Sequence, residues 1–407
     1  MTQLLFINAA VLDTVAGTIT PGMSVLVDGK LIKAMEKGAI DAPGATVIDL
    51  EGRTLMPGLI DCHAHLAVGG MATTALKYPS YIIAQASHWL REMINRGFTT
   101  VRDAGGADAG LRQAVEEGLF VGPRMFVSGR MISQTGGHAD KRWRAAPTTS
   151  EPLVWEQERI ADGVPECLKA VRDELRRGAD QIKIMASGGV ASQGDGIAHL
   201  QFSPEELTAM VEETARQGTY VFAHVYTDKG IRRAAEAGIR TVEHGNFLGE
   251  ETARIMAERG TYLVPTLITY RMDGHYGKSV GFSEASLAKN AEVLEMGTRS
   301  LEIAAAAGVK IAYGTDLCFS PKKHQPEEFL VRAEVQKPAD IIRSATVIGA
   351  EVVRMVDKLG VIKPGAFADL LVIDGNPLED LKLFQNDGQH MAAIIKEGQF
   401  IKNTLAH

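Results

Sequence analysis

The sequence predicts an α/β protein: a (β/α)8 TIM-like barrel with a small β-sandwich domain built from both chain termini. Between residues 59 and 314, eight short runs of apolar or β-branched residues alternate with longer segments of helical spacing. Both ends of the chain instead alternate apolar and polar residues around Asp-Gly, Pro-Gly and Glu-Gly turns. We therefore expect a barrel over residues 56–358 and a discontinuous sandwich over residues 1–55 and 359–407.

The eight runs are the expected barrel strands. The segments between them show helical spacing and have glycine near their ends, which is a helix stop signal. Ser203, Pro204 and Glu206 together form a capping box with proline at the first helical position. Catalytic groups of such a barrel sit at the C-terminal ends of its strands. The runs are residues 59–63, 99–103, 124–128, 181–185, 220–224, 240–244, 261–265 and 310–314.

The terminal segments and one connection complete the predicted organisation. Neither terminal segment makes a convincing core alone, so we expect the two to pair into one domain beside the barrel. The connection over residues 129–165 contains GGHADKRWR and is unusually long for a compact barrel. Loops of that length are usually functional or mobile.

Composition excludes several partners. The 407 residues carry a formal net charge of −7 and no Lys/Arg-rich block, which argues against nucleic-acid and anionic-membrane binding. The N-terminus lacks the pattern of a secretory signal, and no apolar run approaches the roughly 20 residues that cross a bilayer. Three cysteines are too few for a disulfide framework. We expect a cytoplasmic protein that acts on small molecules.

Histidines and one aspartate gather at the expected strand ends. His63 and His65 are two residues apart, so both side chains face the same side of the first strand. His224 ends the fifth run, His244 ends the sixth, and Asp316 follows the eighth. Four imidazoles and a carboxylate on one rim suit Zn²⁺ and related borderline metals. The sequence therefore predicts a metal site at the C-terminal rim.

Lys183, in the fourth run, allows two interpretations. A lysine inside a barrel would be a costly buried ammonium, and its head group then reaches out to water at the rim. Alternatively, desolvation and nearby cations lower the pKa of Lys183 until the amine captures CO₂ as a carbamate, whose two oxygens bridge two metals. The second interpretation turns a misplaced cation into an anionic bridge, and we favour it.

Motifs along almost the whole chain resemble the amidohydrolase superfamily, in particular its Xaa-Pro dipeptidase (prolidase-like) branch. They are PGLIDCHAH, TTVRDAGG, SQTGGHAD, ADQIKIMASGGV, HVYT, TVEHGN, GTD and the tail KPGAFADLLVIDGNPL. The resemblance implies a binuclear site. His63, His65 and Asp316 would bind the more buried metal, His224 and His244 the more exposed one, and carboxylated Lys183 would bridge both. The resemblance also implies that Asp316 handles the proton.

Elementary chemistry then suggests the mechanism. Two divalent cations acidify a bridging water, so that a metal-bridging hydroxide exists near neutral pH. Asp316 accepts the proton, the more exposed metal polarises the scissile carbonyl, and Asp316 returns the proton to the leaving amine. The ligands suit Zn²⁺, Co²⁺ and Mn²⁺ alike, and zinc is our first choice.

Other residues are candidates for substrate binding. His138 follows two glycines in the long connection, and Tyr226 follows His224 by two residues on the same strand face. Both can donate hydrogen bonds to the carbonyl oxygen or to a terminal carboxylate of the substrate. Lys141, Arg142 and Arg144 form a basic cluster that either captures a carboxylate or is simply a solvated loop.

We expect a metal-dependent amide hydrolase that acts on Xaa-Pro or Xaa-hydrophobic dipeptides and on N-acyl amino acids. One alternative keeps the site but cleaves a xenobiotic amide, such as an ochratoxin-like N-acyl phenylalanine, or a carbamate or ester. Another is a non-catalytic scaffold, but such relatives lose metal ligands, and all six positions are present here. Similar proteins assemble into rings or octamers, so a homo-oligomer, possibly an octamer, is expected.

Overall fold

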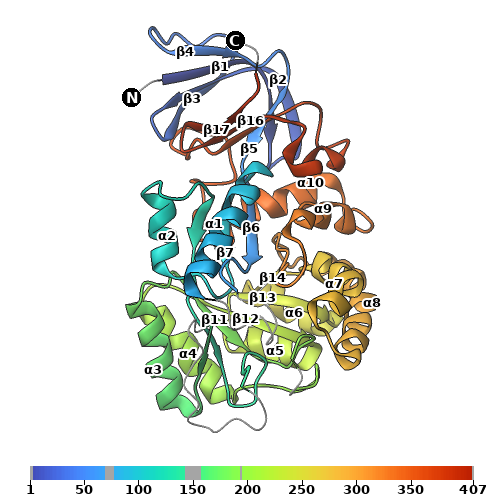
Figure 1. Cartoon of the computed structure of the whole chain (residues 1–407). Helices are drawn as coiled ribbons and strands as arrows, with labels where there is room; N and C mark the ends of the chain where they lie inside the picture. Colours follow the sequence, from blue (N-terminus) through green and yellow to red (C-terminus); the bar gives the residue numbers. More distant parts are fainter. Residues whose placement is uncertain (1–2, 69–77, 143–156, 193–194, 406–407) are drawn as a thin grey trace.

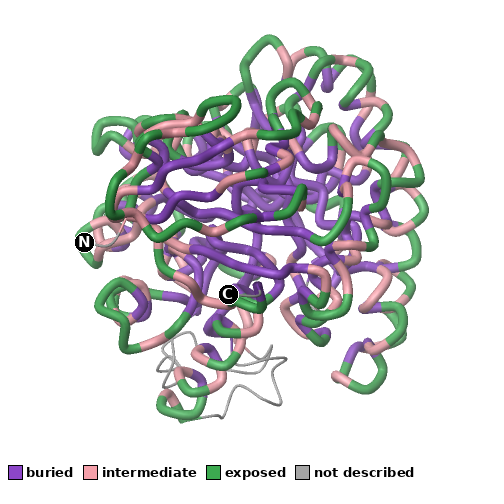
Figure 2. Tube along the Cα trace, turned by 90° about the horizontal axis from the view of Figure 1, so that it is seen from above, coloured by how far each residue is buried: buried purple, intermediate pink, exposed green. Residues whose placement is uncertain are grey.

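The computed structural model describes residues 3–68, 78–142, 157–192 and 195–405. Figure 1 shows a sheet of strands from both ends of the chain above a larger body in which strands and helices alternate. The buried positions lie on the central strands, and exposed positions follow the surrounding helices and loops (Figure 2). In these ranges no helix is long and apolar enough to cross a membrane.

The terminal sheet brings together residues that are more than 300 positions apart. Its strand order is β17-β16-β15-β5-β1-β2-β3, and β4 pairs with β1 beside this path. This agrees with the predicted terminal domain, although the described strands form one hydrogen-bonded sheet rather than two. The strands are β1 (Gln3–Asp13), β2 (Thr18–Asp28), β3 (Leu31–Lys37), β4 (Thr46–Asp49), β5 (Thr54–Pro57), β15 (Leu370–Ile373), β16 (Met391–Lys396) and β17 (Gln399–Asn403).

A bend in β1 allows the single terminal sheet to surround a hydrophobic core. Its register against β2 shifts twice, between Phe6 and Ala9 and between Ala9 and Val11, and Asn8 has a φ of 53°. Such bulges bend a strand and increase its twist. β1 then pairs with β4 through its first half and with β5 through its second half. The apolar residues of both termini pack together on the inner face of the bent sheet.

Parallel strands form the centre of the larger body. A three-stranded sheet has the order β6-β7-β8, and a six-stranded sheet has the order β10-β9-β11-β12-β13-β14. All neighbouring pairs in both sheets are parallel. The strands are β6 (Leu59–Ala64), β7 (Phe98–Asp103), β8 (Arg124–Phe126), β9 (Met131–Ser133), β10 (Glu158–Ile160), β11 (Ile182–Met185), β12 (Val221–Thr227), β13 (Thr241–Phe247) and β14 (Tyr262–Val264).

Seven of the eight predicted runs contain these strands, and the eighth differs. Residues 310–314 form only an isolated parallel bridge, in which Ile311 pairs with Leu263. The same segment is held to β6 because Cys62 N donates to Tyr313 O at 2.8 Å. Gly314 permits this close approach, since a Cβ there would lie 2.9 Å from His63 Cβ. The short strands β9 and β10 were not predicted; each spans three residues, too few to show a pattern.

Helices follow the strands of the larger body, as the alternation predicted. The predicted capping box begins α4: Glu206 N donates to Ser203 Oγ, and Ser203 N donates to the Glu206 carboxylate. The helices are α1 (Pro79–Asn95), α2 (Ala109–Glu116), α3 (Gly163–Arg176), α4 (Pro204–Arg216), α5 (Asp228–Glu236), α6 (Glu250–Arg259), α7 (Leu267–Val280), α8 (Glu284–Ala306), α9 (Glu327–Arg332), α10 (Pro338–Arg343) and α11 (Gly349–Val352).

Candidate metal centre

The C-terminal end of β6 lies next to the residues that follow the eighth run. Thr315 N and Asp316 N both donate to His63 O, at 3.1 and 2.8 Å. These bonds place the Asp316 side chain directly beside His63 of β6 and beside His65, which follows the end of that strand. Its Oδ1 lies 3.5 Å from His63 Nε2 and 3.3 Å from His65 Nε2. The predicted pairing of the first and last strand ends is therefore present.

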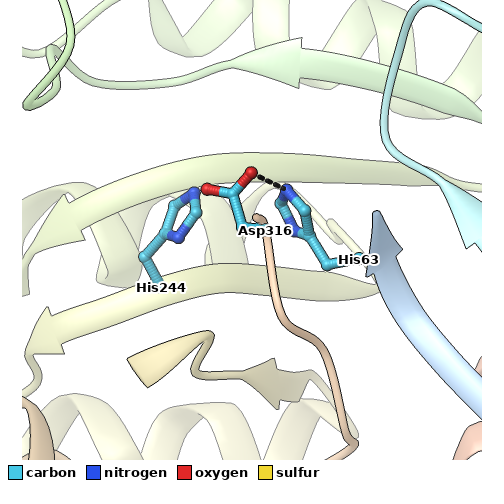
Figure 3. A group of neighbouring side chains, drawn as sticks. All are labelled: His63, His244 and Asp316. Atoms are coloured by element: carbon cyan, nitrogen blue, oxygen red, sulfur yellow. Dashed lines mark ion pairs between the residues drawn. The ribbon is translucent and has the colours of Figure 1, made fainter. Parts of the chain in front are cut away.

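His244 completes a compact group with His63 and Asp316. One ligand atom from each of the three residues lies within 4.8 Å of the others. Figure 3 shows the two imidazole rings on either side of the Asp316 carboxylate. The resemblance assigns His63 and Asp316 to one metal and His244 to the other. The ligand atoms of the three residues are close enough together to belong to one two-metal site.

His224 and the two predicted substrate-binding residues join the same cluster. The ring of His224 lies 4.6 Å from that of His244, centroid to centroid. His138 stacks on His224 at 4.2 Å, and Tyr226 stacks on His244 at 5.1 Å. Gly189 makes room for His138, because a Cβ there would overlap the imidazole ring. The structure thus brings together every histidine that the strand pattern selected, together with His138 and Tyr226.

Lys183 is buried on β11, among the parallel strands of the larger body. Its side chain is 1% exposed, so the interpretation in which its head group reaches water at the rim is wrong. The ammonium lies 5.2 Å from the centre of the Phe222 ring, and no hydrogen bond or salt bridge joins it to another described residue. Burial lowers the pKa of Lys183 to about 8, against the opposing influence of Glu243 and Asp316. The amine is therefore easily deprotonated.

Each of the four histidines predicted as ligands has one ring nitrogen already engaged. His63 Nδ1 bonds to Glu243 at 2.6 Å, His65 Nδ1 to Gly105 O at 2.8 Å, and His244 Nδ1 to Thr266 Oγ1 at 2.8 Å. His224 is reversed, because its Nε2 faces Gly188 O at 3.3 Å. Second partners of this kind orient metal-binding imidazoles and fix their tautomer. The second ring nitrogens of His63 and His65 face the Asp316 carboxylate.

The charge state of the cluster also fits a metal. Burial lowers the pKa values of His63 and His224 well below the usual range and that of His244 to about 3, so these imidazoles are neutral. Burial alone would raise the pKa of Asp316, but His63 and His65 outweigh it and keep the carboxylate ionised. His63 Nε2 is buried and has no hydrogen-bond partner among the described residues. Neutral imidazoles, a carboxylate and an orphaned nitrogen suit divalent metals.

Glu243 and Arg102 support the cluster, and the sequence analysis missed both. Arg102 Nη2 donates to Glu243 Oε1 at 2.8 Å, and both side chains are fully buried. Neighbouring residues in a strand normally face opposite sides, yet Glu243 and His244 both reach the cluster. His244 has a φ of 75°, which interrupts the alternation at this point. A glutamate directly before a predicted ligand was the signal available in the sequence.

Two more residues beside the cluster have unusual backbone conformations. Asp316 and Thr266 both have a φ of 50°, in the left-handed region that side chains disfavour. Thr266 is the partner of His244, and it immediately precedes α7. Strain of this kind gathers at functional sites because the surrounding structure must hold it. Three such residues around one cluster support the assignment of this region as the site.

The predicted substrate-binding residues have defined partners. His138 Nδ1 lies 3.0 Å from Ser192 Oγ, and Tyr226 OH accepts from Tyr270 OH at 3.2 Å. Lys141 donates to Gln157 Oε1 at 2.7 Å, and Arg142 pairs with Asp140 at 2.7 Å. These two members of the basic cluster are therefore engaged within the protein. Its third member, Arg144, lies outside the described residues.

Comparison with known proteins identifies the family. Residues 54–400 match the amidohydrolase family. This chain is an amidohydrolase. Ochratoxinase from Aspergillus niger is 33% identical over 378 residues, which cover 86% of this chain and 75% of that protein. The resemblance inferred from the motifs is thereby confirmed, and the chain is a hydrolytic enzyme.

Solved structures are similar over nearly the entire length of this amidohydrolase. A prolidase complexed with N-methylphosphonate-L-proline is 43% identical, with a TM-score of 0.95, and 99% of this chain and 100% of that chain are covered. A Xaa-Pro dipeptidase with methionine bound in its active site is 31% identical, with a TM-score of 0.89 over 99% and 100% of the two chains. These relatives agree with both the dipeptidase prediction and its amidase alternative.

Arg102→Met tests the support beneath the cluster. The substitution leaves the Glu243 carboxylate buried without its cation, and breaking a buried pair in this way costs roughly 3–5 kcal/mol. We expect the free energy of unfolding of the amidohydrolase to fall by about that amount in a denaturant titration. Arg172→Met is the matched control, since Arg172 pairs with Glu213 but is 58% exposed. A loss for Arg102→Met no larger than for this control would contradict the prediction.

Proposed function

We propose that this amidohydrolase is a binuclear metal-dependent dipeptidase that cleaves Xaa-Pro or Xaa-hydrophobic dipeptides and related N-acyl amino acids. The observation that carries the proposal is Lys183, a buried amine without a partner among the described residues. It lies close enough to His63, His224 and His244, and to Asp316, to interact with them electrostatically. An unmodified ammonium is costly there. A metal-bridging carbamate removes that cost and explains why a lysine occupies this position.

The metal ligands in this proposal are those that the resemblance implies. His63, His65 and Asp316 hold one divalent ion, and His224 and His244 hold the other. Zinc is the first choice, and cobalt or manganese also fit these donors. Lys183 would be the ligand shared by the two ions: its neutral amine would form a bond to the carbon of CO₂ and lose one proton, which leaves a carbamate with two oxygens.

The chemistry divides between the metals and the protein. Bound together, two divalent ions supply an acidified water and a Lewis acid for the scissile carbonyl. Asp316 accepts the proton of the attacking water at a carboxylate oxygen and passes it to the leaving nitrogen. Its lowered pKa makes the group ionised before the reaction, as a proton acceptor must be.

His138 and Tyr226 are proposed to hold the substrate. Burial raises the pKa of Tyr226, so the phenol keeps its proton and can donate it in a hydrogen bond. Tyr226 stacks on His244 and His138 stacks on His224, so both lie beside the histidines assigned to the second metal. A carbonyl oxygen or terminal carboxylate at that metal lies within their reach.

We also propose the finer architecture that the sequence suggested. Asp180 N donates to Val127 O at 2.7 Å, and the eighth run bonds to both β14 and β6. These contacts support closure of the two parallel sheets into a (β/α)8 barrel over residues 56–358. Residues 1–55 and 359–407 would then form the second domain. Homo-oligomerisation and a cytoplasmic location stay predictions.

A second candidate function follows from one comparison. Ochratoxinase is 33% identical to this chain, and its name places its substrate outside peptide metabolism. The same machinery can hydrolyse a xenobiotic amide, a carbamate or an ester, because it acts only on the carbonyl and its leaving group. The two proposals differ in the groups that flank the scissile bond.

A substrate screen decides between them. A dipeptide library that varies both positions, supplemented with N-acyl amino acids and with ochratoxin A, should show the highest kcat/KM for dipeptides with proline or an apolar residue at the C-terminal side. Release of the free amino acid is measured with protein reconstituted with zinc, cobalt or manganese. Preference for ochratoxin A would favour the second candidate, and no hydrolysis of any amide would reject both.

Lys183→Ala tests the bridge. We expect the variant to lose bound metal and activity together, because the second metal loses its shared ligand, and short-chain carboxylic acids such as propionate should restore part of both. Metal content is measured by mass spectrometry of the purified protein. Lys169→Ala, at a side chain that is 66% exposed, is the control. Normal metal content with full activity would show that Lys183 is not a bridge.

Asp316→Asn tests proton transfer. The amide keeps the shape of the side chain but is a poor base, and general acid–base catalysis typically contributes 10²- to 10⁴-fold. We therefore expect kcat to fall by about that factor while the thermal midpoint stays near the parent value. Asp340→Asn serves as a surface control, because Asp340 is 51% exposed. A near-normal kcat would reject the proton-transfer role.

A further inference from the structure

Asp273 is a buried carboxylate beside the metal cluster that the proposed mechanism does not use. It lies on α7, one helical turn beyond Thr269 and Tyr270. Thr269 Oγ1 donates to Asp316 O at 2.9 Å, and Tyr270 OH donates to Tyr226 OH at 3.2 Å. Residues three and four positions apart on a helix share one face. The face of α7 that borders the cluster therefore also carries Asp273.

On the side away from α7, Asp273 contacts the segment that follows Asp316. Ser320 Oγ donates to Asp273 Oδ1 at 2.9 Å. Tyr226, Asp316 and Cys318 all lie close enough to Asp273 to feel its charge. The carboxylate is 6% exposed. It is thus placed between α7 and the loop that carries Asp316, beside the groups assigned to the metals and the substrate.

Asp273 lacks the partners that other buried acids here possess. Asp103 accepts from the backbone amides of Leu66, Gly105 and Ala107, and Glu243 is paired with Arg102. Asp273 accepts a hydrogen bond from Ser320 Oγ, and the Thr269 hydroxyl, which donates to Asp316 O, also lies beside it. No lysine, arginine or histidine among the described residues forms an ion pair with Asp273. A carboxylate has about four acceptor sites, so part of its capacity is unused.

With so few partners, the ionised form of Asp273 is costly unless a positive charge binds beside it. Burial, opposed by the bond from Ser320 and assisted by repulsion from Asp316, raises the pKa of Asp273 to about 7. A positive charge beside it would restore the ionised form and gain a charge-assisted hydrogen bond. In a dipeptide, the free amine is attached to the carbon next to the scissile carbonyl. In any productive pose that ammonium lies close to the metal ligands, where Asp273 is found.

We propose that Asp273 binds the α-ammonium group of the substrate and thereby selects dipeptides over N-acyl amino acids. The inference rests on the proposed function and refines its substrate class. Asp273 is a specificity residue here: it touches the part of the substrate that does not react. An N-acyl amino acid offers no cation at this point and leaves the carboxylate as it is in the free protein.

The test uses two substrates that differ only in the amine. L-Ala-L-Pro and N-propionyl-L-proline have the same scissile bond and leaving group, and the second simply lacks the ammonium. The measured quantity is the ratio of their kcat/KM values with the metal-loaded full-length protein. We expect the parent enzyme to prefer L-Ala-L-Pro, and Asp273→Asn to lower that ratio by about ten- to a hundredfold, as expected for a hydrogen bond between charged groups.

Glu328→Gln is the matched control. Glu328 is also fully buried, burial likewise raises its pKa to about 7, and it accepts from Ile268 N at 2.7 Å at the start of the same helix α7. Its loss should disturb the helix and lower both rates in proportion, so the ratio stays the same. Asparagine at position 273 still accepts the bond from Ser320, so a purely structural role for Asp273 would also leave the ratio unchanged.

The outcomes separate this inference from the proposed function. If both substrates are hydrolysed and Asp273→Asn changes them equally, the role of Asp273 is overturned and the dipeptidase stands. If neither is hydrolysed, the proposed function fails and this inference fails with it. If Asp273→Asn does not fold, the parent ratio decides: a preference for L-Ala-L-Pro of tenfold or more supports the inference, and a ratio near one overturns it.

Discussion

The guanidinium group of Arg102 is the constraint on which the rest of the site depends. Arg102 belongs to β7, yet it donates to Cys62 O on β6 and to both Thr241 Oγ1 and Glu243 on β13. One side chain therefore ties three strands together across the interior of the body. Glu243, held in this way, fixes the ring of His63 through Nδ1. A buried ion pair contributes little net stability, because desolvation offsets its attraction, but it imposes a single geometry on the groups around it.

Electrostatics explains why so many polar groups can share this interior. Burial keeps the imidazoles neutral and Asp316 remains a carboxylate, so the donors are present in the forms that bind divalent ions. Lys183 is the exception, because it places an amine with a pKa of about 8 among them. In the proposed carboxylated form that amine becomes an anion, and the cluster changes from a group with a surplus cation into a complete set of ligands. The low dielectric of the interior makes the gain large.

The residues around the cluster are better suited to selecting a substrate than the predicted metal ligands. The ligands serve the scissile carbonyl, which all candidate substrates share. α7 supplies Thr269, Tyr270 and Asp273 along one face, and the loop after Asp316 supplies Ser320. His138 stacks on His224, and Tyr226 stacks on His244 and accepts a hydrogen bond from Tyr270 of α7. Dipeptides and N-acyl amino acids share a scissile bond and differ in charge near it. Charged groups among these residues are thus the natural place for the prolidase-like and ochratoxinase-like relatives to differ.

The sequence by itself determined the predicted metal ligands and most of the strands, because strand alternation and strand-end position are local patterns. His63 and His65, His224, His244 and Asp316 could each be selected from a few neighbouring letters, and Lys183 from its place in an apolar run. Tertiary structure alone decided which of these residues meet, and it introduced Glu243, Arg102 and Asp273. The contacts Glu243–His63, Arg102–Glu243 and Asp273–Ser320 join residues 47 to 180 positions apart, and no local periodicity encodes such a contact. The left-handed backbone at His244 is equally invisible in the pattern, since only the packed tertiary structure can hold it.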